Sequence, residues 1–316
     1  MTLNITSPSS PSRTKRFRRS LLAAVLLIVG TEVAVRLSGA VDFPLYSVDD
    51  EIGYAIKPNQ EGHFLNKNHW VFNDRGMGIQ KNWEPSSKPN LLLLGNSIVM
   101  GGNPYNQSDK LGPLLQTKLG DRVTVWPVAV GGWSNVNESV YLRRNTDVVK
   151  ATNFFVWEYM HGGLSRLSPA RGEYVFPTHK PVYATWYVAR RYVLPRFFNF
   201  DMNELPPQGD TQVANVVEFE KLVSELSVAS QSKTPGILFL YPGKDEYIGT
   251  KNGKDYVPDR KELQRIAATY GLKIVDIAQS PEWNTGLYNE GTHPTVEGNN
   301  VLAAILAKSV MESMNI

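Results

Sequence analysis

Short apolar runs alternate with amphipathic stretches over most of the chain. From residue 90 onward, five runs have the length of β-strands: residues 90–94, 123–130, 153–157, 236–241 and 272–277. Five stretches have the spacing of amphipathic helices: residues 111–119, 135–147, 216–231, 259–270 and 296–314. Because strands and helices alternate and hairpin signals are absent, we expect an α/β fold with a mostly parallel five-stranded sheet.

The N-terminal pattern is different and indicates a membrane segment. Residues 1–19 contain five basic side chains and no acidic one, and residues 21–31 carry no charge. Apolar character continues to Leu37, interrupted by Glu32 and Arg36, whose i, i+4 spacing lets them pair on one helix face. We therefore interpret residues 20–38 as a transmembrane anchor with the basic tail in the cytoplasm, and favour it over a signal peptide cleaved near residues 38–40.

Composition narrows the remaining possibilities. With 316 residues, 42% of them hydrophobic, the chain can bury one large core or two modest ones. The net charge of +3 comes from the basic tail, which leaves −2 on the remainder, so no nucleic-acid partner is expected. Cysteine is absent, which excludes disulfides and thiolate metal sites, and no Walker or dinucleotide motif occurs. We expect neither a metal nor another cofactor.

The run at residues 91–102 carries the first candidate chemistry. Four leucines end at Gly95, and the chain continues Gly95-Asn96-Ser97 before an amphipathic stretch. A buried strand that ends this way places the Ser97 hydroxyl at the carboxyl edge of the sheet, where ligands bind in open α/β folds.

A partner for this serine lies near the other end of the chain. A nucleophilic serine needs a base to accept its proton, and the base needs a group that orients its ring. His293, with Glu290 three residues before it, supplies both on one loop. We therefore predict that Ser97, His293 and Glu290 meet at the sheet edge.

These two blocks, about 200 residues apart, resemble the SGNH (GDSL-type) hydrolase superfamily. That family has Gly-Asp-Ser-x-x-x-Gly after its first strand and Asp-x-x-His near its C-terminus; here Asn96 and Glu290 replace the two aspartates. The resemblance implies a flavodoxin-like three-layer α/β/α fold and a Ser97–His293–Glu290 triad. It also implies an oxyanion hole made of the Ser97 and Gly132 backbone N–H groups, with Asn96 anchoring the loop through its side chain.

A third block departs from the family. After the third strand the family has Gly-x-Asn-Asp, whose Asn completes the oxyanion hole, whereas this chain has Trp157-Glu158-Tyr159-Met160-His161. The segment resembles the alginate-acetylation branch of the superfamily. The third oxyanion donor is therefore unidentified: Glu158 cannot donate while ionised, and His161 could donate if protonated. Together with Asn96 and Trp133, these two residues are the candidate pocket residues.

Two further segments flank the catalytic blocks. Residues 39–89 lack the apolar residues for a core of their own, so we interpret them as a strap that packs on a catalytic domain of residues 90–316. Residues 164–207 are an insertion rich in aromatic and arginine side chains. It could form a glycan-binding wall, a membrane or partner surface, or simply its own core.

Together these observations predict a serine-dependent enzyme of the bacterial inner membrane with its domain in the periplasm. It would transfer or hydrolyse acyl groups, with acetyl as the expected group, on an envelope or exported polysaccharide. A membrane-bound protein could supply the acyl group. The alternatives are a plain carboxylesterase or lipase acting on small esters, and a catalytically silent scaffold of a polysaccharide export complex.

Overall fold

A five-stranded parallel sheet forms the centre of the molecule. The computed structural model describes residues 13–85, 87–160, 162–198 and 212–316. The strands are β5 (Asn90–Gly95), β6 (Thr124–Ala129), β7 (Phe154–Tyr159), β8 (Gly236–Leu240) and β9 (Lys273–Asp276). They pair in the order β6-β5-β7-β8-β9, all parallel. The predicted α/β fold class is confirmed, and the order is that of flavodoxin-like sheets, with the switch point between β5 and β7.

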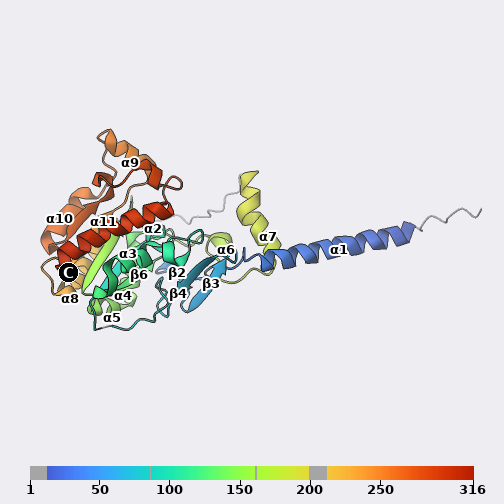
Figure 1. The fold of residues 1–316 in the computed structure, drawn as a ribbon, viewed down its shortest axis with the longest axis horizontal. Helices are drawn as coiled ribbons and strands as arrows, with labels where there is room; N and C mark the ends of the chain where they lie inside the picture. Colours follow the sequence, from blue (N-terminus) through green and yellow to red (C-terminus); the bar gives the residue numbers. More distant parts are fainter. Residues whose placement is uncertain (1–12, 86, 161, 199–211) are drawn as a thin grey trace, which may run out of the picture.

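Helices cover both faces of this sheet (Figure 1). On one face α3 (Leu111–Leu119) packs against α11 (Val296–Met314). The other face carries α4 (Asn135–Arg144), α5 (Thr146–Ala151), α8 (Gln212–Ser230) and α10 (Arg260–Tyr270). The single helix predicted over 135–147 is wrong, because the chain breaks at Asn145, whose side-chain amide donates to the carbonyl of Tyr141.

Burial on both faces explains the unbroken apolar runs of the central strands. All six residues of β5 and all six of β7 are buried. A parallel strand covered on both faces needs no polar alternation, which is why Leu91–Leu94 reads as a continuous apolar run. Glu158 is the one charged residue type in β7, and its carboxyl is buried among the apolar side chains of the strand.

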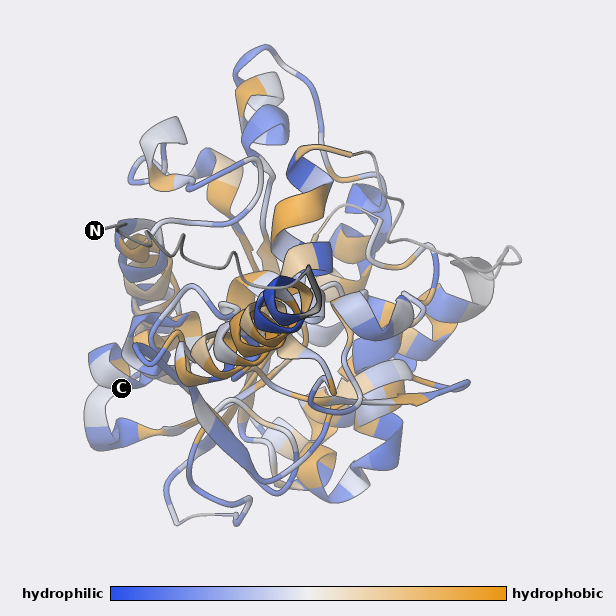
Figure 2. Ribbon diagram, turned by 90° about the vertical axis from the view of Figure 1, so that its right-hand side faces the viewer, coloured by the Kyte–Doolittle hydropathy of each residue, from blue (hydrophilic) through white to orange (hydrophobic). Residues whose placement is uncertain are grey.

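Helix α1 (Arg13–Leu37) projects away from the rest of the molecule (Figure 1). Its segment Lys15–Leu37 is long and apolar enough to cross a membrane, a criterion that a signal sequence near an N-terminus also meets. Seen nearly along its axis, the helix has hydrophilic residues at its tip and hydrophobic residues behind them (Figure 2). It begins seven residues before the predicted start of the anchor and ends one residue before its predicted end.

The strap contains two β-hairpins that the sequence did not indicate. Strands β1 (Tyr46–Asp49) and β2 (Gly53–Ile56) pair antiparallel, as do β3 (Gln60–Phe64) and β4 (Asn68–Phe72). Strands of four or five residues with polar positions give little periodic signal, so the strap offered no strand pattern to predict them from. Their apolar side chains, including Ile52, Tyr54 and Trp70, belong to the same core as the large sheet.

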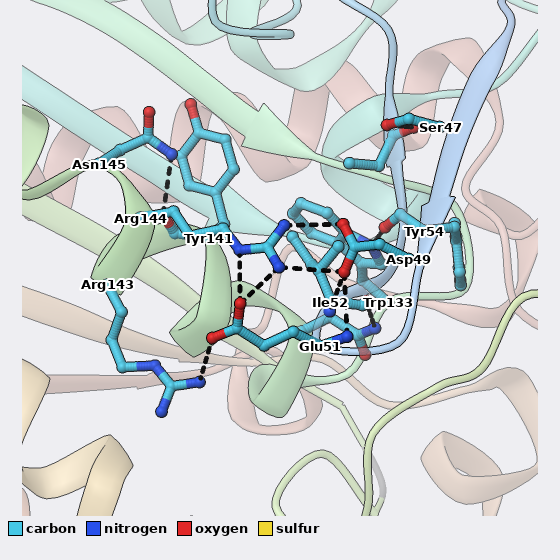
Figure 3. A network of polar contacts seen from close by, with 12 residues as sticks. Ser47, Asp49, Glu51, Ile52, Tyr54, Trp133, Tyr141, Arg143, Arg144 and Asn145 are labelled. Atoms are coloured by element: carbon cyan, nitrogen blue, oxygen red, sulfur yellow. Dashed lines mark hydrogen bonds and ion pairs between the residues drawn. The ribbon is translucent and has the colours of Figure 1, made fainter.

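An ionic network fixes the first hairpin to α4 (Figure 3). The Arg144 guanidinium donates to both carboxylate oxygens of Asp49, at 2.8 and 3.0 Å, and to Glu51. Asp49 Oδ1 also accepts from the backbone N–H groups of Glu51 and Ile52, which shapes the hairpin turn. The hydrogen bonds from Arg144 hold the pKa of Asp49 at about 2, so this network is ionic over the physiological pH range.

A buried amide completes the attachment of the strap. The Asn137 side chain is fully buried, and its amide donates to the carbonyls of Ile52 and Ser168, at 2.8 and 2.9 Å. Its Oδ1 accepts from the backbone N–H of Ser134 at the start of α4. One side chain thus joins the strap, the beginning of the insertion and the helix that follows β6.

The insertion forms short helical elements next to the strap. These are α6 (Gly172–Val175), α7 (Ala184–Val188), a π-helical turn (Ala189–Val193) and a 3-10 turn (Leu194–Arg196). Residues 199–207 of the predicted insertion lie outside the described residues. Tyr187 stacks on Phe43 and Phe176 on Tyr54, both strap residues, whereas Tyr174 stacks on Tyr187 within the insertion. These rings therefore belong to a core that the insertion shares with the strap.

Candidate active site

The end of β5 sets the position of Ser97. Asn96 caps the short helix α2 (Ser97–Met100), and its Oδ1 accepts the N–H of Ile98 at 3.1 Å, so Asn96 anchors this loop through its side chain. Gly95 is required by close packing, because a Cβ there would lie 2.3 Å from Oε2 of Glu158. Ser97 therefore sits at the carboxyl end of β5, beside the switch point of the sheet.

The structure brings Ser97, His293 and Glu290 together. His293 Nε2 lies 2.9 Å from Ser97 Oγ, and His293 Nδ1 lies 2.5 Å from Glu290 Oε1. A carboxylate accepts only, so Nδ1 carries the proton and Nε2 is free to accept from the serine hydroxyl. The His293 side chain is 35% exposed and that of Glu290 65% exposed, so the far side of this chain of contacts is open to solvent.

One bond within the histidine loop and two bonds from other segments hold it in place. The backbone N–H of Asn289 donates to the carbonyl of His293 at 2.8 Å. The Tyr241 hydroxyl, at the end of β8, donates to the carbonyl of Thr292 at 2.8 Å. The Tyr105 hydroxyl donates to the carbonyl of Pro294. These bonds position the imidazole before any substrate arrives.

The glycine turn after β6 lies directly beside the serine. A Cβ on Gly131 would be 3.9 Å from Cβ of Ser97. Gly132 has a φ of 82°, and a Cβ there would lie 2.9 Å from the Tyr54 hydroxyl, so only glycine fits. Tyr54 donates to the carbonyl of Gly131, and the Trp133 indole donates to the carbonyl of Tyr54. Sequence reasoning missed Tyr54 as a site residue, since its contact comes from a distant segment.

A cavity of about 700 Å³ opens next to Ser97. Three of the predicted pocket residues line it, Asn96, Trp133 and Glu158, together with Gly132. The fourth, His161, lies outside the described residues. Trp133 is buried with its indole N–H bound to the strap, so it shapes the wall of the cavity.

Glu158 lies beneath the serine loop as an incompletely paired carboxyl. It is 1% exposed, and its Oε2 accepts the N–H of Asn96 at 3.0 Å. Its Oε1 is buried without a hydrogen-bond partner in the described part of the chain. Burial raises the pKa of Glu158 to about 8, so the group is mostly neutral at pH 7. The premise that Glu158 is ionised, and so unable to donate, does not hold in this environment.

Glu138 is a second buried carboxyl on the same cavity, and no motif in the sequence marks it. Its Oε2 accepts from the Asn135 amide at 2.8 Å and from the Trp157 indole. The Asn135 amide also donates to the backbone carbonyl of Glu158 at 2.7 Å. Burial raises the pKa of Glu138 well above its usual value.

Comparisons with known proteins give only distant likeness. No protein-family model matches the chain, and no curated protein does. Among solved structures, the esterase EstA of Pseudoalteromonas sp. is 12% identical with a TM-score of 0.42, covering 72% of this chain and 100% of its own. A lipase/acylhydrolase of Enterococcus faecalis is 15% identical with a TM-score of 0.43, covering 70% of this chain and 95% of its own.

A third similar structure is a carbohydrate acetylesterase of Sinorhizobium meliloti. It is 14% identical with a TM-score of 0.40, and the match covers 71% of this chain and 99% of the acetylesterase. Likeness at this level carries no argument about activity. The interpretation of the site therefore depends on its own geometry.

The raised pKa of Glu158 predicts how stability changes with pH. The folded chain keeps a proton on Glu158 up to about pH 8, whereas the unfolded chain releases it near 4.5. Folding then binds a proton between these values, so the free energy of unfolding falls as pH rises, by up to about 1.4 kcal/mol per pH unit. Urea unfolding of the full chain in detergent between pH 5 and 8 measures this slope.

The variant Glu158→Gln should flatten this slope, because the amide keeps the contact with Asn96 and cannot ionise. Glu282→Gln, at an exposed position, is the matched control and should leave the slope unchanged. An unchanged slope in Glu158→Gln would show that Glu158 is ionised in the folded protein.

Proposed function

We propose that the chain is a serine-dependent enzyme of the SGNH type that acts on acyl esters. The observation that carries the proposal is the continuous contact from Ser97 Oγ through His293 to Glu290, at 2.9 and 2.5 Å. A neutral imidazole between a hydroxyl and a carboxylate is the arrangement that activates a serine. This geometry favours an enzyme over a silent scaffold.

The reaction would proceed in two halves. Ser97 Oγ attacks the acyl carbonyl while its proton passes to His293 Nε2, and Glu290 stabilises the imidazolium. The tetrahedral intermediate collapses, His293 returns the proton to the leaving alcohol, and an acyl ester of Ser97 remains. Water or a second hydroxyl then attacks this ester, its proton moving to His293 and finally to Ser97 Oγ.

The oxyanion would be bound by the Ser97 and Gly132 backbone N–H groups and by Glu158. The protonated Glu158 carboxyl lines the same cavity as Ser97 and Gly132. Its buried Oε1 makes no hydrogen bond within the described residues and can donate one when protonated. A neutral acid in this place supplies the donor that the family's Asn would supply. Its ionisation would put a negative charge beside the developing oxyanion and oppose the reaction.

For the substrate, we propose acetyl groups on an envelope or exported polysaccharide, with the domain held on the periplasmic side of the bacterial inner membrane. The apolar helix α1 supports the location. The cavity supports a hydroxyl-rich ligand, because Asn135, Ser134 and Arg166 offer polar groups on its wall. None of the described rings of the insertion lines this cavity, so they add no stacking wall beside Ser97.

We further propose that the acyl group goes to a sugar hydroxyl rather than to water. The Trp157-Glu158 segment, which resembles the polysaccharide-acetylating branch, supports transfer, as does the polar cavity beside Ser97. A plain esterase for small esters is the second candidate, favoured by the solvent exposure of His293 and Glu290, which lets water approach.

Ser97→Ala should reduce turnover of an aryl acetate by roughly 10⁴-fold or more, because the nucleophile is lost. Glu290→Gln should cost less, roughly 10²- to 10⁴-fold, since its carboxylate is solvent-exposed and the imidazole keeps one hydrogen bond. Release of the aryl alcohol measures both. Ser108→Ala, at an exposed serine, is the matched control. Wild-type turnover in Ser97→Ala would refute the nucleophile.

The proposed role of Glu158 predicts an alkaline limit to activity. As the pH rises through about 8, Glu158 ionises and kcat should fall. Glu158→Gln keeps a hydrogen-bond donor in place, so this variant should remain active at pH 7, and its kcat should no longer fall as the pH rises through about 8. Glu158→Leu removes the donor, which costs about 2.7–4 kcal/mol of barrier, or roughly 10²–10³ in rate. An alkaline limb that persists unchanged in Glu158→Gln would contradict the role.

Transfer predicts dependence on an acceptor. An oligosaccharide should speed turnover of an acetyl donor and appear as the acetylated sugar by mass spectrometry. Ser97→Ala, treated identically, controls for spontaneous transfer. Turnover that ignores the acceptor and yields only free acetate would favour the esterase.

A further inference from the structure

The segment 182–198 exposes an unusual set of aromatic side chains. Among the described residues, every exposed Phe, Tyr and Trp outside α1 lies in it: Tyr183, Trp186, Phe197 and Phe198, which are 71%, 54%, 75% and 59% exposed. Val182 and Val193 of the same segment are also exposed, at 71% and 45%. Ala184 and Tyr187 of this segment are buried against Val41 and Phe43.

This segment is fixed to the last turns of α1. The two carboxylate oxygens of Glu32 accept the backbone N–H groups of Ala184 and Thr185, at 2.8 and 2.9 Å. Arg36 pairs with Glu32 at 2.8 Å and donates to the carbonyl of Val182 at 2.6 Å. The two charged residues that interrupt the apolar helix are thus the ones that bind the insertion, and each charge is paired there.

Helices α1 and α7 contact each other. Figure 1 shows α7 rising at a steep angle to α1, at the end where α1 leaves the domain. If α1 passes through a bilayer, a helix that lies across its end runs along the membrane surface. The charge fits this position, because residues 182–198 contain Arg190, Arg191 and Arg196 and no acidic residue.

We propose that residues 182–198 form a second membrane contact, an interfacial element that lies on the bilayer at the end of α1. Tyr183, Trp186 and Phe197 enter the headgroup region, where aromatic rings are favoured, and the exposed Arg196 faces anionic lipid headgroups, whereas Arg190 and Arg191 pack on Tyr174 and Tyr187. The proposal rests on the proposed membrane location of α1. It gives the catalytic domain one fixed orientation over the membrane, which a single spanning helix would not.

The absence of cysteine allows a direct test. Trp186→Cys and Phe197→Cys, each carrying a spin label, are reconstituted as full chains in vesicles of phosphatidylethanolamine and phosphatidylglycerol. Collision with oxygen, which concentrates in lipid, is compared with collision with a water-soluble nickel chelate. We expect both labels to collide preferentially with oxygen. Val228→Cys, 75% exposed on α8, is the aqueous control, because α8 lies on the side of the molecule away from α1 (Figure 1).

A label at Val29→Cys, within α1, separates the possible failures. Labels at 186 and 197 that behave like the one at 228, while the label at 29 lies in lipid, would overturn the interfacial contact and leave the anchor intact. A label at 29 in water would overturn the anchor and, with it, this proposal. Labels at 186 and 197 shielded from both reagents would overturn it in favour of a protein partner on this face.

Discussion

The buried carboxyl of Glu158 is the constraint on which the site depends. It lies on β7 at the switch point of the sheet and holds the backbone N–H of Asn96, the residue before the nucleophile. Its proximity leaves room only for glycine at position 95. Burial keeps the carboxyl neutral, and a neutral acid can bond both to the loop behind it and to a ligand in front of it. Ionising this carboxyl would leave a buried charge without a cationic partner, which is costly.

The strap gives the site its second support. Tyr54 makes two hydrogen bonds at the glycine turn. Its hydroxyl donates to the carbonyl of Gly131, and its backbone carbonyl accepts from the Trp133 indole. Asn137 and the Arg144 network hold the hairpin that carries Tyr54. A segment without a core of its own therefore positions a backbone donor of the proposed oxyanion hole. Helix α1 leads directly into this strap, so one continuous segment contacts the glycine turn and carries the apolar helix.

Much of this architecture could be predicted from the sequence. The five strands were placed within a few residues, because strands buried on both faces give unbroken apolar runs. The pairing of Ser97 with His293 and Glu290 followed from motifs at the two ends of the chain, since parallel strands bring their carboxyl ends to one edge. Residues 296–314 were expected as a helix, and α11 has those bounds.

Only the tertiary structure decided the features that depend on surroundings. Glu138 and Glu158 look like ordinary acidic residues in the sequence, but the fold removes both from water and thereby raises the pKa of both. The hairpins of the strap take their stability from the core of another segment, so their own pattern is weak. Glu32 reads as a charge inside an apolar helix, and its purpose becomes visible only where the insertion supplies two backbone N–H groups. Local patterns report local structure, whereas protonation and long-range contacts are properties of the folded chain.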